Sequence, residues 1–314
     1  MPTQGGEITL GRGGENSGGG ADADRWLKVG FVAPALLVLI SVNIFPLIYS
    51  IWLSFTNADL VGGGIRSVGT LNYSFLFFDP RYAQALRTTV LFVALAVGIE
   101  LVLGYGLALC LRPTFRGKPI LLTALLVPMM MPPAVMGVYW TLILNGSFGV
   151  LNQALGLLGL PELQWLTDPD LKLVSIILID VWMWTPFTIL ISLAGLNAIP
   201  ASIYEAAAVD RATTWMVFRR ITLPMSAPLV GLAALLRATD ALKQFDLVMA
   251  ITGPNDGATQ TLSALLYQVM FRDGKVGLAS AYSYMVLVVV IALASVFLRY
   301  LASLQHRASA TEAT

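Results

Sequence analysis

The sequence predicts an all-α integral membrane protein built as a bundle of six transmembrane helices. Of the 314 residues, 57% are hydrophobic and only 12% are charged, whereas a soluble domain is usually about 45–50% apolar and about 25% charged. The mean hydropathy is +0.76. The apolar residues gather in six long runs, each near the roughly 20 residues that a helix needs to cross a bilayer. Because lipid cannot hydrogen-bond to an open backbone, we expect these runs to be helical.

The chain begins with a glycine-rich polar stretch and then alternates spans with connections. Residues 1–28 contain few apolar side chains and are expected to be disordered. The six predicted spans are residues 29–53, 86–111, 119–144, 172–196, 225–250 and 278–301. Pro128, Pro132 and Pro133 interrupt the third span, where we expect a hinge or a static bend. Residues 306–314 form a short polar tail.

Lysine and arginine are distributed unequally between the two sets of connections. Most of them fall on the side of the N-terminus, among them Arg112 and Lys118 after the second span and Arg219 and Arg220 after the fourth. Basic residues are enriched in the cytoplasmic loops of membrane proteins. We therefore expect both termini in the cytoplasm, together with the long loop 197–224 between the fourth and fifth spans.

This loop reads NAIPASIYEAAAVDRATTWMVFRRITLP and predicts two short helices joined by a tight turn. Ser202 followed by Glu205 matches a capping box, and the alanine run favours a helix. The Thr213-Thr214 pair can cap the second helix, and Pro224 marks its expected end. A smooth alanine face with a carboxylate at each end suits docking in a groove of another protein. An interfacial helix whose arginines meet lipid headgroups is the alternative.

Several classes of function are disfavoured by what the chain lacks. His306 is the only histidine and Cys110 the only cysteine, so we expect no histidine-ligated metal site and no intrachain disulfide. The nucleotide-binding motif G-x-x-x-x-G-K-[ST] does not occur. We therefore expect no catalytic residue and no cofactor bound by this chain. The net charge of +1 gives no indication of a nucleic-acid partner.

The loop also resembles a known motif. EAAAVDRA from Glu205, followed by ITLP ending at Pro224, is similar to the EAA motif of permease subunits of binding-protein-dependent ATP-binding-cassette (ABC) importers. The resemblance covers residues 29–305. FVAPALLVLISVNIFPLIYSIWLSF resembles the first span of the sugar-importer branch, FGVLNQALGLLGLP its external segment, and RATDALKQFDLVMAITGP its fifth-span signature. Arg211 stands where the family normally has glycine, which favours a left-handed backbone.

The resemblance implies a type I ABC importer permease fold, with residues 29–305 as the permease domain. The EAA helix would sit in a cleft of a separate ATPase, which uses ATP and Mg²⁺. The residues that match the coupling motif are Glu205, Ala206, Ala207, Asp210, Arg211, Ile221, Leu223 and Pro224. A second homologous permease, forming a heterodimer, and an extracytoplasmic solute-binding protein are the other implied partners. The implied location is a bacterial or archaeal plasma membrane.

Charged residues also occur inside the predicted spans. They are Glu100, Asp180, Arg237, Asp240, Lys243 and Asp246. Each charge at a helix centre costs roughly 2.5–3.5 kcal/mol on insertion scales, so these side chains should face the bundle interior, a partner or an aqueous path. The last four have i,i+3 spacing and can form a ladder of alternating sign along one helix face. Glu100 and Asp180 can pair across helices or belong to the interface with the second permease.

A polar wall lining a solute path is the functional alternative to such a ladder. The candidates for this path are Trp182, Trp184, Asp240, Lys243, Gln244 and Tyr282. The aromatic ones can instead be interfacial anchors. We expect the chain to move a carbohydrate, which can be a sugar, an oligosaccharide or a glycerol-phosphate-like solute. The alternative is an ion-coupled secondary transporter, whose inverted repeats are not evident in this sequence.

Overall fold

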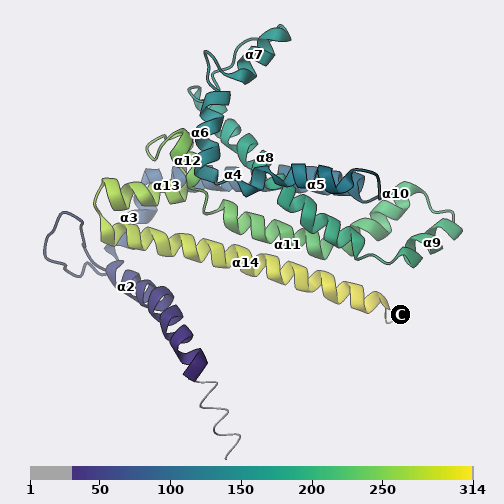
Figure 1. Ribbon diagram of the computed structural model, residues 1–314. Helices are drawn as coiled ribbons and strands as arrows, with labels where there is room; N and C mark the ends of the chain where they lie inside the picture. Colours follow the sequence, from purple (N-terminus) through teal and green to yellow (C-terminus); the bar gives the residue numbers. More distant parts are fainter. Residues whose placement is uncertain (1–29, 313–314) are drawn as a thin grey trace, which may run out of the picture. The chain divides into compact units, whose positions relative to one another are not determined.

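The computed structural model describes residues 30–312, with side chains as far as Arg299. Within this range every regular element is a helix (Figure 1), and one isolated β-bridge pairs Thr56 with Ser67. The elements are η1 Ile40–Ile44, α2 Phe45–Leu53, α3 Leu71–Phe78, α4 Pro80–Leu111, α5 Lys118–Leu126, η2 Pro128–Met130, α6 Pro133–Ile143, α7 Val150–Leu157, α8 Pro169–Asn197, α9 Ala201–Val209, α10 Thr214–Val217, η3 Phe218–Thr222, α11 Leu223–Ala241, α12 Asp246–Ile251, α13 Leu262–Tyr267, η4 Gln268–Arg272 and α14 Val276–Glu312. The chain divides into two compact units, one ending at Trp52 and one beginning at Leu53. The expected tails lie wholly or partly outside the described residues.

The first predicted span is a continuous apolar helix over Gly30–Leu53, with mean hydropathy 2.4. A π-helical turn, η1, lies within it. The amide of Asn43 donates to the Leu39 carbonyl oxygen at 2.9 Å, so this polar side chain is bonded within its own helix. Large apolar side chains such as Phe31 and Phe45 are exposed. A helix of this length and surface suits the hydrocarbon core of a bilayer.

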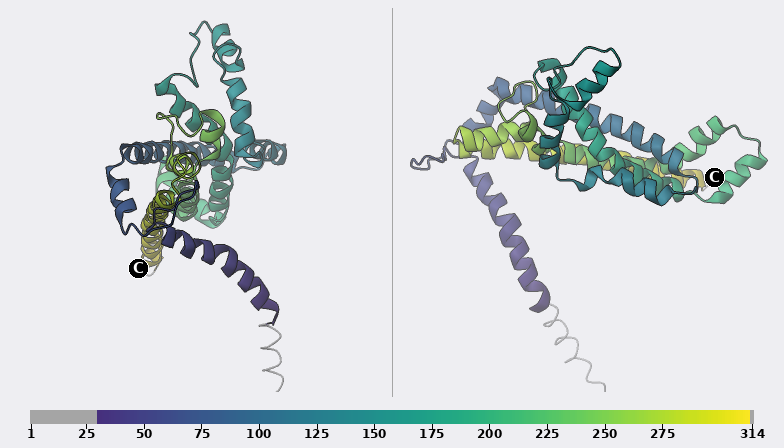
Figure 2. Two further views of the ribbon diagram at one scale, coloured as in Figure 1. Left: turned by 90° about the vertical axis from the view of Figure 1, so that its left-hand side faces the viewer. Right: turned by 45° about the horizontal axis from the view of Figure 1, so that its top comes forward.

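The second unit is built around four long helices, α4, α8, α11 and α14. The α11 helix packs against the other three, and α4 packs along α8 (Figures 1 and 2). Each of the four belongs to a segment long and apolar enough to cross a membrane. Two of them begin at an aspartate followed by proline. The side chains of Asp79 and Asp168 accept hydrogen bonds from the backbone N–H groups of Arg81 and Asp170, which satisfies orphan donors of the first turn.

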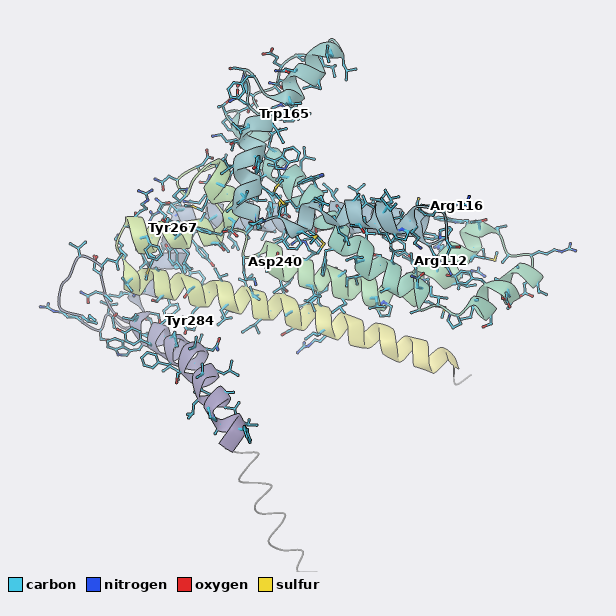
Figure 3. All side chains as sticks on the ribbon, viewed as in Figure 1. Arg112, Arg116, Trp165, Asp240, Tyr267 and Tyr284 are labelled. Atoms are coloured by element: carbon cyan, nitrogen blue, oxygen red, sulfur yellow. The ribbon has the colours of Figure 1, made fainter. Side chains whose placement is uncertain are left out.

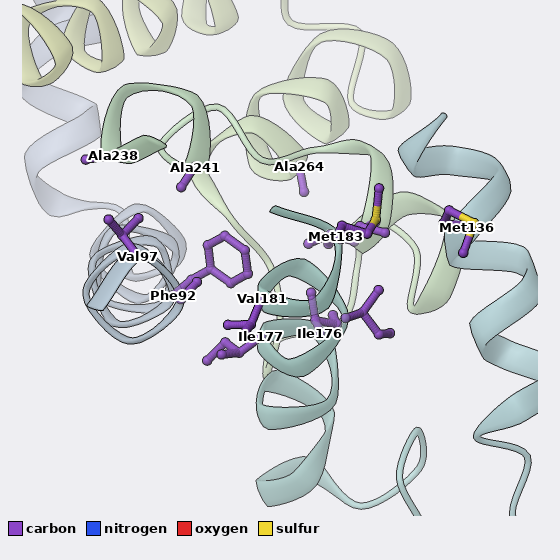
Figure 4. Close-up of a cluster of buried hydrophobic side chains, with 14 of the residues drawn as sticks. Phe92, Val97, Met136, Ile176, Ile177, Val181, Met183, Ala238, Ala241 and Ala264 are labelled. Atoms are coloured by element: carbon purple, nitrogen blue, oxygen red, sulfur yellow. The ribbon is translucent and has the colours of Figure 1, made fainter. Parts of the chain in front are cut away.

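Close approach between α4 and α8 depends on a glycine. A Cβ added to Gly104 would lie 2.6 Å from the Thr188 Cβ and 3.2 Å from the Ile189 backbone nitrogen. The main apolar core lies further along the same helices (Figure 4). Phe92 of α4 and Ile176 and Met183 of α8 are fully buried there, against alanines of α11 and α13. Large side chains facing small ones let the helices pack closely.

The third predicted span is not one helix, so residues 30–312 contain five long apolar helices where the sequence predicts six spans. Residues 118–143 divide into α5, the short 3₁₀ turn η2 and α6. Met131 and Pro132 both have extended backbone geometry, which a residue before proline prefers. Two prolines in succession therefore break the helix rather than bend it. The α5 and α6 helices run in clearly different directions (Figures 1 and 2).

The fifth predicted span is displaced toward the N-terminus. One continuous helical segment runs over Thr214–Ala241 through α10, η3 and α11, whereas the sequence predicts a span at 225–250. Pro224 does not end the second loop helix as predicted. It follows the π-helical turn η3, and such a turn can absorb the hydrogen bond that proline cannot donate. After Ala241 the chain turns and resumes as the short helix α12.

Candidate functional site

Two features of the second unit are candidates for function. One is the α9–η3 loop at one end of the helix bundle, and the other is a cluster of charged side chains inside the bundle. The loop begins with α9, whose N-cap is Pro200 without a side-chain cap hydrogen bond. The predicted capping box of Ser202 and Glu205 is therefore not formed, because the helix begins before Ser202. The predicted threonine cap of the second helix is confirmed, since Thr213 Oγ1 accepts from the Met216 N–H at 3.3 Å.

The turn after α9 has the geometry that glycine normally provides. Arg211 has a φ of 53° and is, among the described residues, the only non-glycine residue with positive φ. Its N–H donates to the Ala208 carbonyl at 3.1 Å, and the Ala212 N–H donates to the Ala207 carbonyl at 2.9 Å. This pair of bonds is a Schellman motif, which closes helices with a left-handed residue. The arginine thus adopts the left-handed turn despite its side chain.

A cleft of about 620 Å³ lies between α9 and the α10–η3 segment. Of the residues that match the EAA motif, the cleft is lined by Ala206, Ala207, Asp210, Arg211 and Ile221. The other three, Glu205, Leu223 and Pro224, are exposed outside it. The loop therefore presents small side chains and charges of both signs on a concave surface.

The charged cluster is centred on Arg237 of α11, which is 2% exposed. Its guanidinium binds Glu100 of α4 in a bidentate pair, Nε to Oε2 at 2.7 Å and Nη2 to Oε1 at 2.9 Å. Nη2 also donates to Asp180 Oδ2 of α8 at 2.8 Å. Nη1 donates to Asp240 Oδ2 at 2.9 Å. One arginine thus ties three helices together, and a bidentate carboxylate pair fixes its orientation.

This cluster decides between the alternatives left open by the sequence. Glu100 and Asp180 each form an ion pair with Arg237 of another helix. Only the first step of the proposed ladder, Arg237 with Asp240, is formed. Among the described residues, Lys243 makes no ion pair with Asp240 or with Asp246. Sequence reasoning could not join Glu100 to Arg237, because 137 positions separate them.

Three of the predicted solute-path residues lie around this cluster. The ring of Trp184 lies 4.6 Å from the Arg237 Cζ, within the range of a cation–π contact. Gln244 Nε2 donates to the second oxygen of Asp180 at 2.9 Å. The Asp240 side chain is 54% exposed, unlike the other carboxylates of the cluster, and lies midway along the bundle (Figure 3).

The other three predicted path residues lie elsewhere. Trp182 packs edge-to-face on Trp140, with ring centroids 5.4 Å apart. Lys243 is exposed and lines a separate groove of about 280 Å³. Tyr282 is 1% exposed and its hydroxyl donates to Asp79 Oδ2 at 2.8 Å. Its buried position leaves no ring face open to a solute.

The Asp79–Tyr282 pair belongs to a polar group at the opposite end of the bundle from α9. Burial alone would raise the pKa of the Asp79 carboxyl, but hydrogen bonds from Arg81 and Tyr282 outweigh it, so the pKa falls below its usual value. Arg81 also pairs with Asp273 at 3.1 Å. These contacts join the start of α4 to α14 and to the turn before it.

Sequence reasoning also missed the residue that organises the connection before α8. Asn152 of α7 is 4% exposed. Its amide donates to the carbonyls of Gly146 and Leu163 at 2.9 Å, and its oxygen accepts from the Trp165 indole at 2.8 Å. Asn152 lies within FGVLNQALGLLGLP, the stretch that resembles the external segment of the sugar-importer branch, but that resemblance gives the asparagine no role.

The sequence of this chain matches known transport proteins. Residues 100–309 match the family model described as "Binding-protein-dependent transport system inner membrane component". The trehalose/maltose transport system permease protein MalF of Thermococcus litoralis is 33% identical over 277 residues, covering 88% of this chain and 94% of that protein. The trehalose transport system permease protein SugA of Mycobacterium tuberculosis H37Rv is 33% identical over 278 residues, covering 88% and 89%.

A solved structure agrees with the fold. The crystal structure of a bacterial ABC transporter involved in the import of the acidic polysaccharide alginate contains a chain that superposes with a TM-score of 0.80. That chain is 21% identical in sequence, and the match covers 90% of this chain and 98% of the other. The fold is accordingly that of an ABC importer permease. The chain belongs to the family of binding-protein-dependent transport system inner membrane components.

Proposed function

We propose that this chain is the permease subunit of an ABC importer that carries a carbohydrate into the cytoplasm. The observation that carries the proposal is the exposed α9 helix with its Schellman turn, which presents the EAA residues at one end of a membrane bundle. A surface of small side chains permits close approach by another protein, and charges at its ends can fix the register.

A separate ATPase is the partner that this surface fits. The cleft between α9 and η3 offers about 620 Å³ to a protruding segment of that partner. Glu205 and Asp210 would supply the charges, and Ala206 and Ala207 the smooth contact face. ATP and Mg²⁺ would be used by the ATPase, with no cofactor bound by this chain. The bias of basic residues supports an arrangement in which α9 and both termini face the cytoplasm.

The carbohydrate assignment rests on relatives and on the chemistry of the Arg237 cluster. Relatives that share about a third of their residues with this chain are named for trehalose, maltose and sulfoquinovosyl glycerol transport. Asp240 and Gln244 offer planar polar groups, and Trp184 adds an aromatic face beside them. Such a combination suits a ligand rich in hydroxyl groups, because ligand sites join a few placed polar groups to apolar walls.

Two further partners complete the proposal. A second homologous permease would close the solute path. In a single bundle the Asp240 side chain is exposed, so the path would be open on that side. An extracytoplasmic solute-binding protein would deliver the solute to the end of the bundle opposite α9. We take the permease pair to be a heterodimer, as the resemblance to the sugar-importer branch implies.

Copurification tests the coupling role. The tagged chain is expressed in its native host, extracted in mild detergent and examined for an ATPase. We expect the wild type and the control Glu162→Arg to retain it, since Glu162 is an exposed acid on the connection before α8. Glu205→Arg, which reverses a charge on α9, should lose it. An ATPase that stays with Glu205→Arg would remove Glu205 from the interface, and no ATPase in any sample would contradict the importer.

A further inference from the structure

The α9 helix is held to the rest of the bundle by few contacts. Of its nine residues only Ala207 is buried. Glu205, Ala206 and Ala208 are exposed along its length. A helix with so little apolar burial gains little fixed position from packing. Beyond its chain connections to α8 and α10, α9 therefore depends on directional side-chain contacts to reach the other membrane helices.

Tyr204 supplies two such contacts, to two different elements. Its ring lies 4.1 Å from the Cζ of Arg112, in the geometry of a cation–π contact. Its hydroxyl lies 3.2 Å from the Thr222 Oγ1 of η3. Thr222 is itself 5% exposed. One aromatic side chain thus bridges α9 to the C-terminal end of α4 and to the beginning of the α11 segment.

The Arg112 end of this bridge is itself fixed. Arg112 is the C-cap of α4 and follows the buried Leu111. Lys118 Nζ at the start of α5 donates to the carbonyl oxygens of Arg112 and Pro113 at 3.2 and 3.3 Å. Among the described residues Arg112 forms no salt bridge. Its guanidinium lies over the Tyr204 ring in the cation–π contact described above, at the α9 end of the bundle (Figure 3).

We propose that Tyr204 is a positioning residue that fastens α9 to α4 through Arg112 and to η3 through Thr222, so that a movement imposed on α9 is passed directly to α4. The inference rests on the proposed function, because it takes an ATPase to be what moves α9. The α4 helix is the one that carries Glu100, the bidentate partner of Arg237. The Tyr204–Arg112 contact therefore connects the loop mechanically to the helix that holds the charged cluster.

The chain contains its own reporter for this movement. Cys110, the only cysteine, is exposed and lies two positions before Arg112 on α4. An environment-sensitive maleimide fluorophore on Cys110, in a complex whose other subunits lack cysteine, reports the surroundings of the α4 end. Emission is compared with ATP and Mg²⁺ and with ADP and Mg²⁺, so no knowledge of the solute is needed.

Three variants separate the contacts. Tyr204→Phe keeps the ring over Arg112 and removes only the hydroxyl bond to Thr222. Tyr204→Leu removes both contacts, and Arg112→Gln removes the cation from outside the loop. We expect the nucleotide-dependent emission shift in the wild type and in Tyr204→Phe. It should be lost in Tyr204→Leu and in Arg112→Gln, while ATP hydrolysis by the retained ATPase continues.

The result that would overturn the proposal is an emission shift of wild-type size in both Tyr204→Leu and Arg112→Gln. A wild-type complex that hydrolyses ATP without any shift at Cys110 would overturn it too, since α4 would then not follow α9. If Tyr204→Leu loses the ATPase, Arg112→Gln decides the matter, because its side chain belongs to α4. Failure of the wild type to bind an ATPase contradicts the proposed function instead.

Discussion

Replacing Arg211 by glycine should stabilise the turn that closes α9. The φ of 53° at this position is left-handed, a conformation that costs a residue with a Cβ roughly 1–2 kcal/mol. Glycine removes that cost but loses more backbone entropy on folding, about 0.5–1 kcal/mol. The net gain is therefore about 0.5–1 kcal/mol, or roughly two- to fivefold in the local opening equilibrium.

Hydrogen exchange at the Ala212 amide measures this gain directly. That amide closes the Schellman motif by donating to the Ala207 carbonyl at 2.9 Å, so its protection reports opening of the turn. After correction for intrinsic exchange rates, Arg211→Gly should be about two- to fivefold more protected than the wild type. Arg211→Ala removes the charge but keeps the Cβ, and it should gain nothing. Equal protection in the glycine and alanine variants would show that backbone strain is not what distinguishes this position.

The remaining predictions concern the bundle. Arg237→Gln leaves the buried carboxylates of the cluster without their cation and should destabilise the chain by about 3–5 kcal/mol. The loss should appear as a large drop in the thermal unfolding midpoint in detergent, and an unchanged midpoint would refute the structural role of the cluster. Gly104→Ala should destabilise by about 1–3 kcal/mol through overpacking against the Thr188 Cβ. Adding Thr188→Gly, which removes that Cβ, should restore part of the loss, and a double variant no better than the single would refute this. Because the pKa of Asp79 is lowered in the folded chain, its contribution to stability is present above its unfolded pKa, about 4, and is lost as the pH falls through the folded value. Asp79→Asn should therefore flatten the acid side of the stability–pH profile, and an acid limb as steep as that of the wild type would contradict the assignment.

Much of the architecture follows from local pattern. The apolar runs predict long helices because length and hydrophobicity alone satisfy the bilayer, and the described residues contain five long apolar helices. The prediction of the third span as one helix is wrong because the adjacent Pro132 and Pro133 interrupt it. The sequence alone does not say whether prolines bend a helix or end it. The displaced fifth span reflects a π-helical turn before Pro224, which no residue pattern specifies.

The candidate sites also divide into features that local sequence indicates and features that depend on how the helices pack. The EAA loop is contiguous in sequence, so a motif could locate it. The left-handed turn is present although Arg211 replaces the glycine that the family normally has there. The charged cluster is assembled from Glu100, Asp180 and Arg237 on three helices. Burial predicts that such charges need partners, but the choice of partner depends on how the helices pack. The Tyr204–Arg112 contact is likewise tertiary, since neither residue lies in a recognisable pattern with the other.

Solute uptake into proteoliposomes tests the central claim most directly. The assembled complex is reconstituted with its solute-binding protein outside and ATP inside, and radiolabelled trehalose and maltose are the first solutes offered. We predict uptake that requires both ATP and the binding protein, is unaffected by proton or sodium ionophores, and is lost with Glu205→Arg. Uptake that proceeds without ATP and collapses with an ionophore would contradict the account and identify an ion-coupled transporter.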